Sequence, residues 1–291
     1  RLQGGGSFPA PTCICRYDKS HCFGCFAETG QHIVVPRQSE ESRFMKLAGK
    51  TAIITGGGRD IGAAVALKFA EEGANVAINY FASSKGADDV VAKIEAAGGK
   101  AIAVQGDLNK QADVDDLVAK TLEEFGGLDI LVNNAGGLIA RKTVAEMDLD
   151  HWNAVMSLNL TSTFMMTKAC LEHIKTGTIV NLASQAARDG GGPGSVAYAS
   201  SKGAIVTMTR GLAKELGPDV RVNALCPGMI DTDFHNIHTP DAGRRGYEAN
   251  APLKRQGTVD DVASAALFLA CDDSAFLTGT NIDINGGMLF S

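Results

Sequence analysis

Short apolar runs alternate with longer amphipathic stretches from residue 46 to the end of the chain. The apolar runs predict β-strands at 51–55, 75–80, 101–106, 129–133, 178–183, 220–225 and 281–284. The stretches between them place apolar residues at helical spacing, which predicts helices at 61–72, 90–97, 114–125 and 151–174. Such alternation is typical of parallel strands joined by helical crossovers.

The pattern therefore predicts an α/β protein with a single doubly wound, Rossmann-like domain and a mostly parallel seven-stranded sheet. No linker, repeat or low-complexity block interrupts residues 46–291, so we assign residues 45–291 to one dinucleotide-binding catalytic domain. We interpret residues 1–44 as a leader or tail, either disordered or not native to the protein.

The composition and net charge limit the kinds of molecule that this protein is expected to bind. The chain has 291 residues, 45% of them hydrophobic and 21% charged, with a net charge of −6. This much apolar surface excludes disorder of the whole chain. The negative charge argues against nucleic acid or an anionic membrane as the main partner, and no window approaches the ~20 apolar residues of a transmembrane helix. We expect a cytoplasmic protein with a small-molecule partner.

The cysteines fall into two groups. Five residues near the start have the chemistry of zinc ligands, namely Cys13, Cys15, His21, Cys22 and Cys25. Their spacing is not that of a standard zinc finger, so a leader or tail is favoured over a metal site, disulfides or a genuine extension, and we expect no metal. The other three cysteines are expected to be small apolar fillers in a reduced protein, at Cys170, Cys226 and Cys271.

A glycine-rich turn follows the first predicted strand, at residues 55–62. In this fold a ligand phosphate binds there, because free N–H groups and the dipole at a helix N-terminus favour an anion. The turn does not fit the pattern GxGxxG, so an ordinary glycine turn is the alternative. We predict a pyrophosphate site at Gly56, Gly58, Arg59, Asp60, Ile61 and Gly62.

The end of the second strand indicates which dinucleotide is preferred. NAD-binding proteins of this fold place an acid there to bind the ribose 2′-hydroxyl, and this chain has the neutral Asn79. Hydroxyl and cationic groups nearby suit a 2′-phosphate instead, at Arg59, Ser83, Ser84 and Lys85. We predict NADP(H) as the preferred cofactor, with NAD(H) possible.

Tyr198 and Lys202 are four residues apart at the start of a predicted helix, which places them on one face. A neighbouring ammonium favours tyrosinate and tunes a phenol of ordinary pKa ~10 toward proton transfer. Ser184 ends a strand fourteen residues earlier and can donate to a substrate carbonyl oxygen. Each signal alone is weak, and their order along the chain makes the set specific.

With these motifs the chain resembles the short-chain dehydrogenase/reductase family over nearly all of residues 46–291. The resemblance rests on the glycine turn, Asp107-Leu108, the segment 133–136, Asn159, Ser184, the Tyr198/Lys202 pair and the segment 227–232. It implies interconversion of a carbonyl and an alcohol with a nicotinamide cofactor. It also implies the family's usual oligomeric state, a homotetramer.

The resemblance also implies residue roles. Tyr198 would be the general acid in reduction, Lys202 would lower its pKa and bind the ribose, Ser184 would polarise the carbonyl, and Asn159 would hold a proton-relay water at a helix distortion. Asp107 and Leu108 would contact the adenine side, Asn133, Ala135 and Gly136 would line the cofactor floor, and Ile230 and Thr232 would hold the carboxamide. Tyr80, Pro227 and Gly228 complete the expected cofactor contacts.

Asp60 departs from the family, which usually has Gly or Ala at this position. A carboxylate near a pyrophosphate would repel it. We expect Asp60 to turn away and cap the following helix, which would change the strength of cofactor binding and not its existence.

The substrate is the least determined feature. A glycine-rich loop at 188–194 and a segment at about 230–256 match the family's pocket wall and substrate lid. We expect Arg188 to anchor a substrate carboxylate, with Gln185, Gly228 and His235 nearby. This favours a small polar ketone or aldehyde, such as a keto acid or keto sugar.

Two alternatives stay open. The general resemblance is closest to 3-oxoacyl-carrier-protein reductases, which bind an acidic carrier through two basic positions. Lys175 matches one of them, but Asp219 occupies the other and the net charge is negative. The second alternative is a non-catalytic dinucleotide-binding sensor on the same fold, which would not need the Asn159, Ser184, Tyr198 and Lys202 set.

Overall fold

The computed structural model describes residues 45–290, so the predicted leader and its cysteine cluster lie outside the described residues. Seven strands form one sheet in the order β3-β2-β1-β4-β5-β6-β7, and every pair is parallel. The strands are β1 (Thr51–Ile54), β2 (Asn75–Tyr80), β3 (Lys100–Gln105), β4 (Ile130–Asn133), β5 (Gly177–Leu182), β6 (Val220–Pro227) and β7 (Asn281–Ile284). The predicted α/β, Rossmann-like fold is confirmed.

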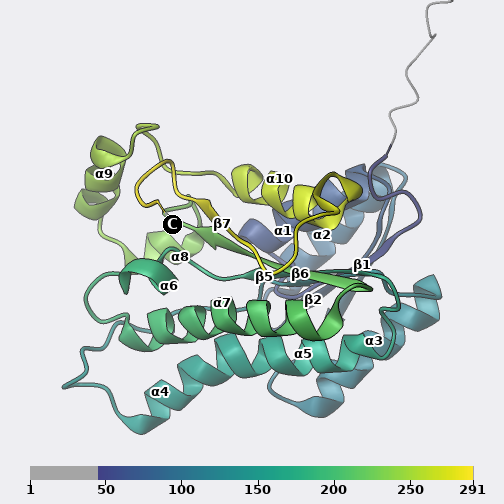
Figure 1. Cartoon of the computed structure of the whole chain (residues 1–291), viewed down its shortest axis with the longest axis horizontal. Helices are drawn as coiled ribbons and strands as arrows, with labels where there is room; N and C mark the ends of the chain where they lie inside the picture. Colours follow the sequence, from purple (N-terminus) through teal and green to yellow (C-terminus); the bar gives the residue numbers. More distant parts are fainter. Residues whose placement is uncertain (1–44, 291) are drawn as a thin grey trace, which may run out of the picture. The chain divides into compact units, whose positions relative to one another are not determined.

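Helices cover both faces of the sheet (Figure 1). One face carries α1 (Asp60–Glu71), α2 (Ser84–Ala96) and α10 (Val259–Ala270). The other carries α3 (Gln111–Phe125), α4 (Leu149–Met156), α5 (Ser162–Leu171) and α7 (Val196–Leu216). Shorter helices lie near one end of the sheet, namely α6 (Ala186–Asp189), α8 (Asp233–His238) and α9 (Asp241–Asn250), and a 3₁₀ turn at Asp272–Ser274 follows α10.

The strands are apolar because both of their faces are covered. Successive side chains point to opposite faces, so Ile54 packs in a cluster with Phe69 of α1, and its neighbour Ile53 packs in a second cluster with Leu117 of α3 and Met166 of α5. The three cysteines of the domain are buried, as predicted for apolar fillers. None of the helices in residues 45–290 has the length and apolar character needed to cross a membrane.

Two predicted helices differ from those observed. The helix expected at 90–97 begins earlier, because α2 starts at Ser84 after the loop that follows β2. The helix expected at 151–174 is interrupted by a π-helical turn, η1 (Ser157–Thr161), between α4 and α5. The spacing of apolar residues does not predict this turn, because the chain remains helical on both sides of it.

The strand order determines where a ligand can bind. The chain runs outward from β1 to β3 and then returns to place β4 on the other side of β1. The connections after β1 and β4 therefore diverge to opposite faces and leave a crevice at the carboxyl ends of these strands.

Candidate active site

A cleft of about 1380 Å³ lies beyond the carboxyl ends of the strands. Loops after β1 to β6 line it together with α8. Most of the predicted site residues lie on its walls: Gly56, Gly58, Arg59, Asp60, Ile61, Gly62, Asn79, Tyr80, Ser83, Asp107, Leu108, Ala135, Gly136, Ser184, Gln185, Tyr198, Lys202, Pro227, Gly228, Ile230, Thr232 and His235.

The glycine turn is a cradle built by close backbone approach. A Cβ on Gly62 would lie 2.2 Å from the Gly56 carbonyl oxygen, and Gly56 has a φ of +63°. A Cβ on Gly86, at the start of α2, would lie 2.1 Å from the Gly58 oxygen. Side chains at these positions would fill the space, so the glycines leave room for a dinucleotide pyrophosphate to approach the backbone and the first turn of α1 closely.

Asp60 does not cap α1, which corrects the sequence prediction. It is the first residue of the helix, has a φ of +50°, and the helix start has no side-chain capping hydrogen bond. Its Oδ1 accepts a hydrogen bond from the Asp233 backbone N–H of α8 at 3.2 Å. Arg59 lies between the two acids, with Nε 3.9 Å from Asp60 and Nη1 3.5 Å from Asp233. The pair thus joins the phosphate turn to the predicted substrate lid.

An Asp60→Asn variant should bind NADPH several-fold more tightly at low ionic strength. The asparagine oxygen can still accept from the Asp233 N–H, and Asn tolerates the left-handed conformation, so the variant loses only the negative charge of Asp60 and its pairing with Arg59. Fluorescence titration measures the Kd, and the gain should shrink at high salt. Asp219→Asn, at the far end of the sheet, is the control. Equal affinities of Asp60→Asn and wild type at low salt would show that the carboxylate does not act on the phosphates.

Asn79 lies at the end of β2 in the wall of the cleft, where its side chain is held by hydrogen bonds to neighbouring backbone groups. It is 2% exposed, and its Nδ2 donates to the Gly106 carbonyl oxygen at 3.1 Å. Its Oδ1 accepts a long hydrogen bond of 3.5 Å from the Gly56 N–H, so it supports the glycine turn. Neither the end of β2 nor residues 81–84 carry a carboxylate. A ribose 2′-hydroxyl would therefore find no acid at the end of this strand.

Helix α7 positions Tyr198 and Lys202 one turn apart, and β5 ends just before Ser184. The Lys202 side chain is buried, and its Nζ donates to the Leu182 carbonyl oxygen at 2.6 Å and lies 5.8 Å from the Tyr198 ring centroid. Burial raises the pKa of Tyr198, and a hydrogen bond from Ser184 opposes that rise. Burial lowers the pKa of Lys202 to about 8.

Asn159 lies in the π-helical turn η1 and holds the loop that lies next to Lys202. Its Oδ1 accepts from the Gly137 N–H at 2.9 Å, and its Nδ2 donates to the Gly137 and Val155 carbonyls, each at 2.8 Å. A Cβ on Gly136 would lie 2.5 Å from Asn159 Oδ1 and 3.2 Å from Lys202 Nζ. Asn159 therefore fixes the 136–137 loop beside Lys202 without itself lining the cleft.

Helix α8, which belongs to the predicted substrate lid, lines one wall of the cleft. The Phe234 ring lies 5.7 Å from the Tyr198 ring, and it meets His235 and His238 edge to face. His235 Nδ1 is 2.9 Å from Thr239 Oγ1. Burial lowers the pKa of His235 to about 4, helped by the positive charges of Arg244 and Arg141. His235 is therefore neutral at pH 7.

Arg188 is placed elsewhere, and the prediction that it anchors a substrate carboxylate is wrong. It does not line the cleft, and its Nη2 lies 3.7 Å from Asp283 Oδ1 of β7. The short helix α6 turns its side chain back toward the edge of the sheet. Three further predicted residues also lie outside the cleft, namely Ser84, Lys85 and Asn133. Asn133 donates to Thr167 and Asn181 in the core, and Ser84 is taken into α2.

Arg141 lines the cleft and is missed by sequence reasoning. It lies five residues after Gly136 in a loop that carries no motif. Its position directly after a cofactor-floor segment is the only signal that could have marked it. No cluster of metal-ligating side chains occurs within the described residues, 45–290.

Comparison with known proteins agrees with this geometry. Residues 56–289 match the family model described as enoyl-(acyl carrier protein) reductase. A 3-oxoacyl-[acyl-carrier-protein] reductase of Synechocystis sp. is 41% identical over 249 residues, which cover 84% of this chain and 98% of that protein. Glucose 1-dehydrogenase 2 of Bacillus subtilis is 36% identical over 253 residues, covering 84% and 96%.

A solved structure has the same architecture. The crystal structure of a short chain dehydrogenase from Burkholderia cenocepacia in complex with NADP shares 38% identity and a TM-score of 0.79, covering 84% of this chain and 99% of that one. The single parallel sheet, the glycine cradle and the Ser184–Tyr198–Lys202 group are thus found in a protein that is similar to known oxidoreductases over most of its length. The chain belongs to the short-chain dehydrogenase/reductase family.

Proposed function

We propose that this protein is an NADPH-dependent oxidoreductase that reduces a ketone or aldehyde to an alcohol, with Tyr198 as general acid. The observation that carries the proposal is the placement of Tyr198 in the cleft, which Ser184 also lines, with the buried ammonium of Lys202 5.8 Å from the centre of its ring. A dinucleotide-binding sensor would not need a proton donor at this point.

The chemistry divides between cofactor and protein. A bound nicotinamide dinucleotide supplies the hydride, and the glycine cradle and the strand ends fit such a group. Ser184 orients the carbonyl oxygen, and Tyr198 gives that oxygen its phenolic proton as the alcohol forms. Lys202 stabilises the resulting phenolate, because a buried cation 5.8 Å from the ring favours the charged form.

NADP(H) is the proposed cofactor, and NAD(H) can serve in its place. The neutral end of β2 supports this choice, together with the Ser83 hydroxyl and the Arg59 guanidinium, which both line the cleft. Arg59 lies 3.5 Å from Asp233, so it must exchange that carboxylate for a 2′-phosphate. The Burkholderia relative, named as a complex with NADP, supports the same cofactor.

The other cofactor contacts follow the family's pattern. We assign Asp107 and Leu108 to the adenine side and Ala135 and Gly136 to the floor. Ile230 and Thr232 are assigned to the carboxamide, and the cleft-lining positions of all six residues support these roles. Asn159 is proposed to hold the relay water, and its place in the π-helical turn beside the 136–137 loop and Lys202 supports this role.

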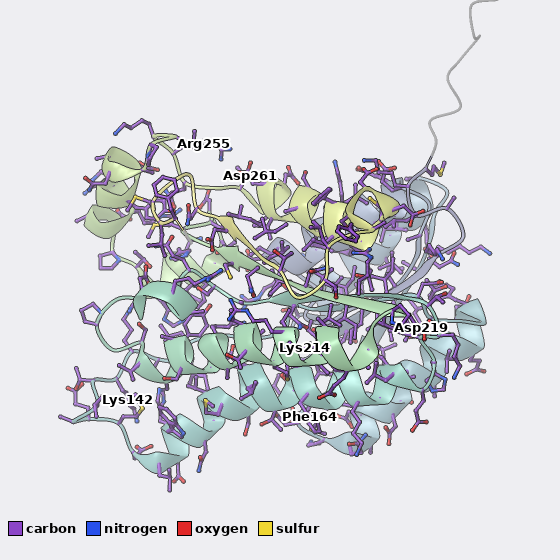
Figure 2. The ribbon with its side chains drawn as sticks, viewed as in Figure 1. Lys142, Phe164, Lys214, Asp219, Arg255 and Asp261 are labelled. Atoms are coloured by element: carbon purple, nitrogen blue, oxygen red, sulfur yellow. The ribbon has the colours of Figure 1, made fainter. Side chains whose placement is uncertain are left out.

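A small polar ketone or aldehyde, such as a keto acid or keto sugar, is the proposed substrate. The alternative is 3-oxoacyl-carrier-protein reduction, which the 41% identical Synechocystis relative favours. The corresponding carrier-docking positions meet at the amino ends of β5 and β6, where the Gly177 N–H donates to the Asp219 carbonyl. Figure 2 shows Asp219 at the end of the sheet away from α8 and α9. The negative charge of Asp219 offsets the positive charge of Lys175 at these two positions. An acidic carrier protein would therefore gain little electrostatic attraction to this surface.

We further propose a cytoplasmic homotetramer. Large aromatic side chains are exposed on helix α5 and around the end of α10, at Phe164, Phe268 and Phe276. Apolar surface of this kind is what subunit interfaces cover.

The test is a titration with NADPH and with NADH, followed by turnover on a panel of carbonyls. We expect NADPH to bind at least about tenfold more tightly, because an ionic contact to the 2′-phosphate is worth about 1.5 kcal/mol. The panel contains acetoacetyl thioesters, neutral diketones and keto sugars. Turnover of the thioesters alone would establish the alternative function, and failure to bind either nucleotide would contradict the enzyme assignment.

A further inference from the structure

Arg141 is held at the cleft by backbone carbonyls from two different walls. Its Nε donates to the His238 oxygen at the end of α8 at 2.9 Å, and its Nη1 donates to the Pro193 oxygen at 2.9 Å. The guanidinium therefore bridges the lid to the glycine-rich loop, and Nη2 has no hydrogen bond of this kind to either wall.

The glycines of that loop give the arginine its place. A Cβ on Gly194 would lie 2.9 Å from Arg141 Cβ, and one on Gly192 would lie 3.4 Å from Nη1. Larger residues would displace the side chain. The small residues of the loop thus serve to seat a guanidinium at the cleft, which is a more specific role than leaving room for substrate.

Arg141 forms no ion pair with another residue of the described range, 45–290, unlike the other arginines near the cleft. Arg59 pairs with Asp60 and Asp233, Arg188 with Asp283, and Arg244 with Asp231. Within residues 45–290, no carboxylate lies within 4.0 Å of the Arg141 guanidinium. The positive charge of Arg141 acts on neighbouring groups of the cleft, because it helps to lower the pKa of both His235 and His238.

We propose that Arg141 is a specificity-determining residue that binds an anionic group of the carbonyl substrate. The two hydrogen bonds to backbone carbonyls orient the Arg141 guanidinium and leave its positive charge available to a ligand. Tyr198 and Ser184 line the same cleft. A substrate whose carboxylate or phosphate is separated from its carbonyl group would bind the anionic group at Arg141 and the carbonyl oxygen at Tyr198 and Ser184. This inference rests on the proposed carbonyl reduction.

Matched substrate pairs that differ in charge test the proposal. We would compare 4-oxopentanoate with its methyl ester, and dihydroxyacetone phosphate with dihydroxyacetone, at saturating NADPH. The wild-type enzyme should prefer the anionic member of at least one pair by about tenfold in kcat/KM, and the pair that shows this identifies the anion. Turnover of the neutral members without any preference for an anion would overturn the inference and leave the proposed function intact.

The Arg141→Gln variant separates recognition from lid positioning. We expect KM for the preferred anion to rise about tenfold with kcat nearly unchanged, and the neutral member to change less than about twofold. Arg141→Lys should recover part of the affinity, because it retains the charge without the fork. The control is Arg245→Gln, an exposed arginine of α9 outside the cleft, which should have no effect.

Equal losses on the charged and neutral members of a pair would overturn the proposal, since they would show that Arg141 only holds the lid. Absence of NADPH oxidation with every compound would contradict the proposed function itself.

Discussion

Replacing Tyr198 with Phe should lower kcat for carbonyl reduction by about a thousandfold and leave the Kd for NADPH within about twofold of wild type. The phenol hydroxyl is the only part removed, and general acid catalysis contributes about 10²–10⁴ in rate. The ring keeps its contact with Phe234, so the lid and cofactor walls should persist. Steady-state kinetics and fluorescence titration on the same preparation measure the two quantities.

A second tyrosine of the cleft provides the control. The Tyr247 hydroxyl donates to the Asn285 carbonyl oxygen at 2.7 Å, so Tyr247→Phe removes a comparable hydrogen bond without removing a proton donor for the substrate. We expect it to retain most of the wild-type kcat. A Tyr198→Phe enzyme that keeps more than a tenth of wild-type kcat would show that another group protonates the product.

Replacing Lys202 with Met should lower kcat by about a hundredfold and change the pH profile. Methionine fills a similar volume, so the fold should survive the loss of a buried ammonium. In the wild type, burial lowers the pKa of Lys202 to about 8. The ammonium is therefore charged below pH 8 and loses its proton above it, and the reduction rate should fall as pH rises through about 8. This limb should be absent in Lys202→Met.

Lys214→Met is the matched control on the same helix. Lys214 is exposed on α7 (Figure 2) and does not line the cleft, so both kcat and the limb near pH 8 should be those of the wild type. An unchanged limb in Lys202→Met would assign that ionisation to another group.

The strands and their burial follow from the sequence because each strand is covered on both faces and is apolar throughout. Ile53 and Ile54 illustrate this, since both are fully buried although they point to opposite faces. The order of the strands is a different matter. The apolar runs indicate seven strands, but the crevice between β1 and β4 depends on how the crossovers pack.

The candidate site divides in the same way. Tyr198 and Lys202 could be predicted, because a fixed spacing on one helix determines their relation. Arg188 and Arg141 could not be distinguished, because loops set their directions. Arg188 is drawn to Asp283 of a strand nearly a hundred residues away, and Arg141 is held by carbonyls of the lid and the glycine loop. The prediction for Asp60 was likewise wrong, since its partner Asp233 lies far along the sequence.

Hydride transfer to a carbonyl, with protonation of the product by Tyr198, is the reaction on which the proposed function depends. It is tested most directly with NADPH that carries deuterium at the transferred position of the nicotinamide, incubated with the purified protein and an accepted carbonyl compound. We expect an alcohol with one deuterium on the carbinol carbon from the wild type and almost none from Tyr198→Phe. Tight NADPH binding with no deuterated alcohol from the wild type, across the whole carbonyl panel, would contradict the proposed reaction and favour a dinucleotide-binding sensor.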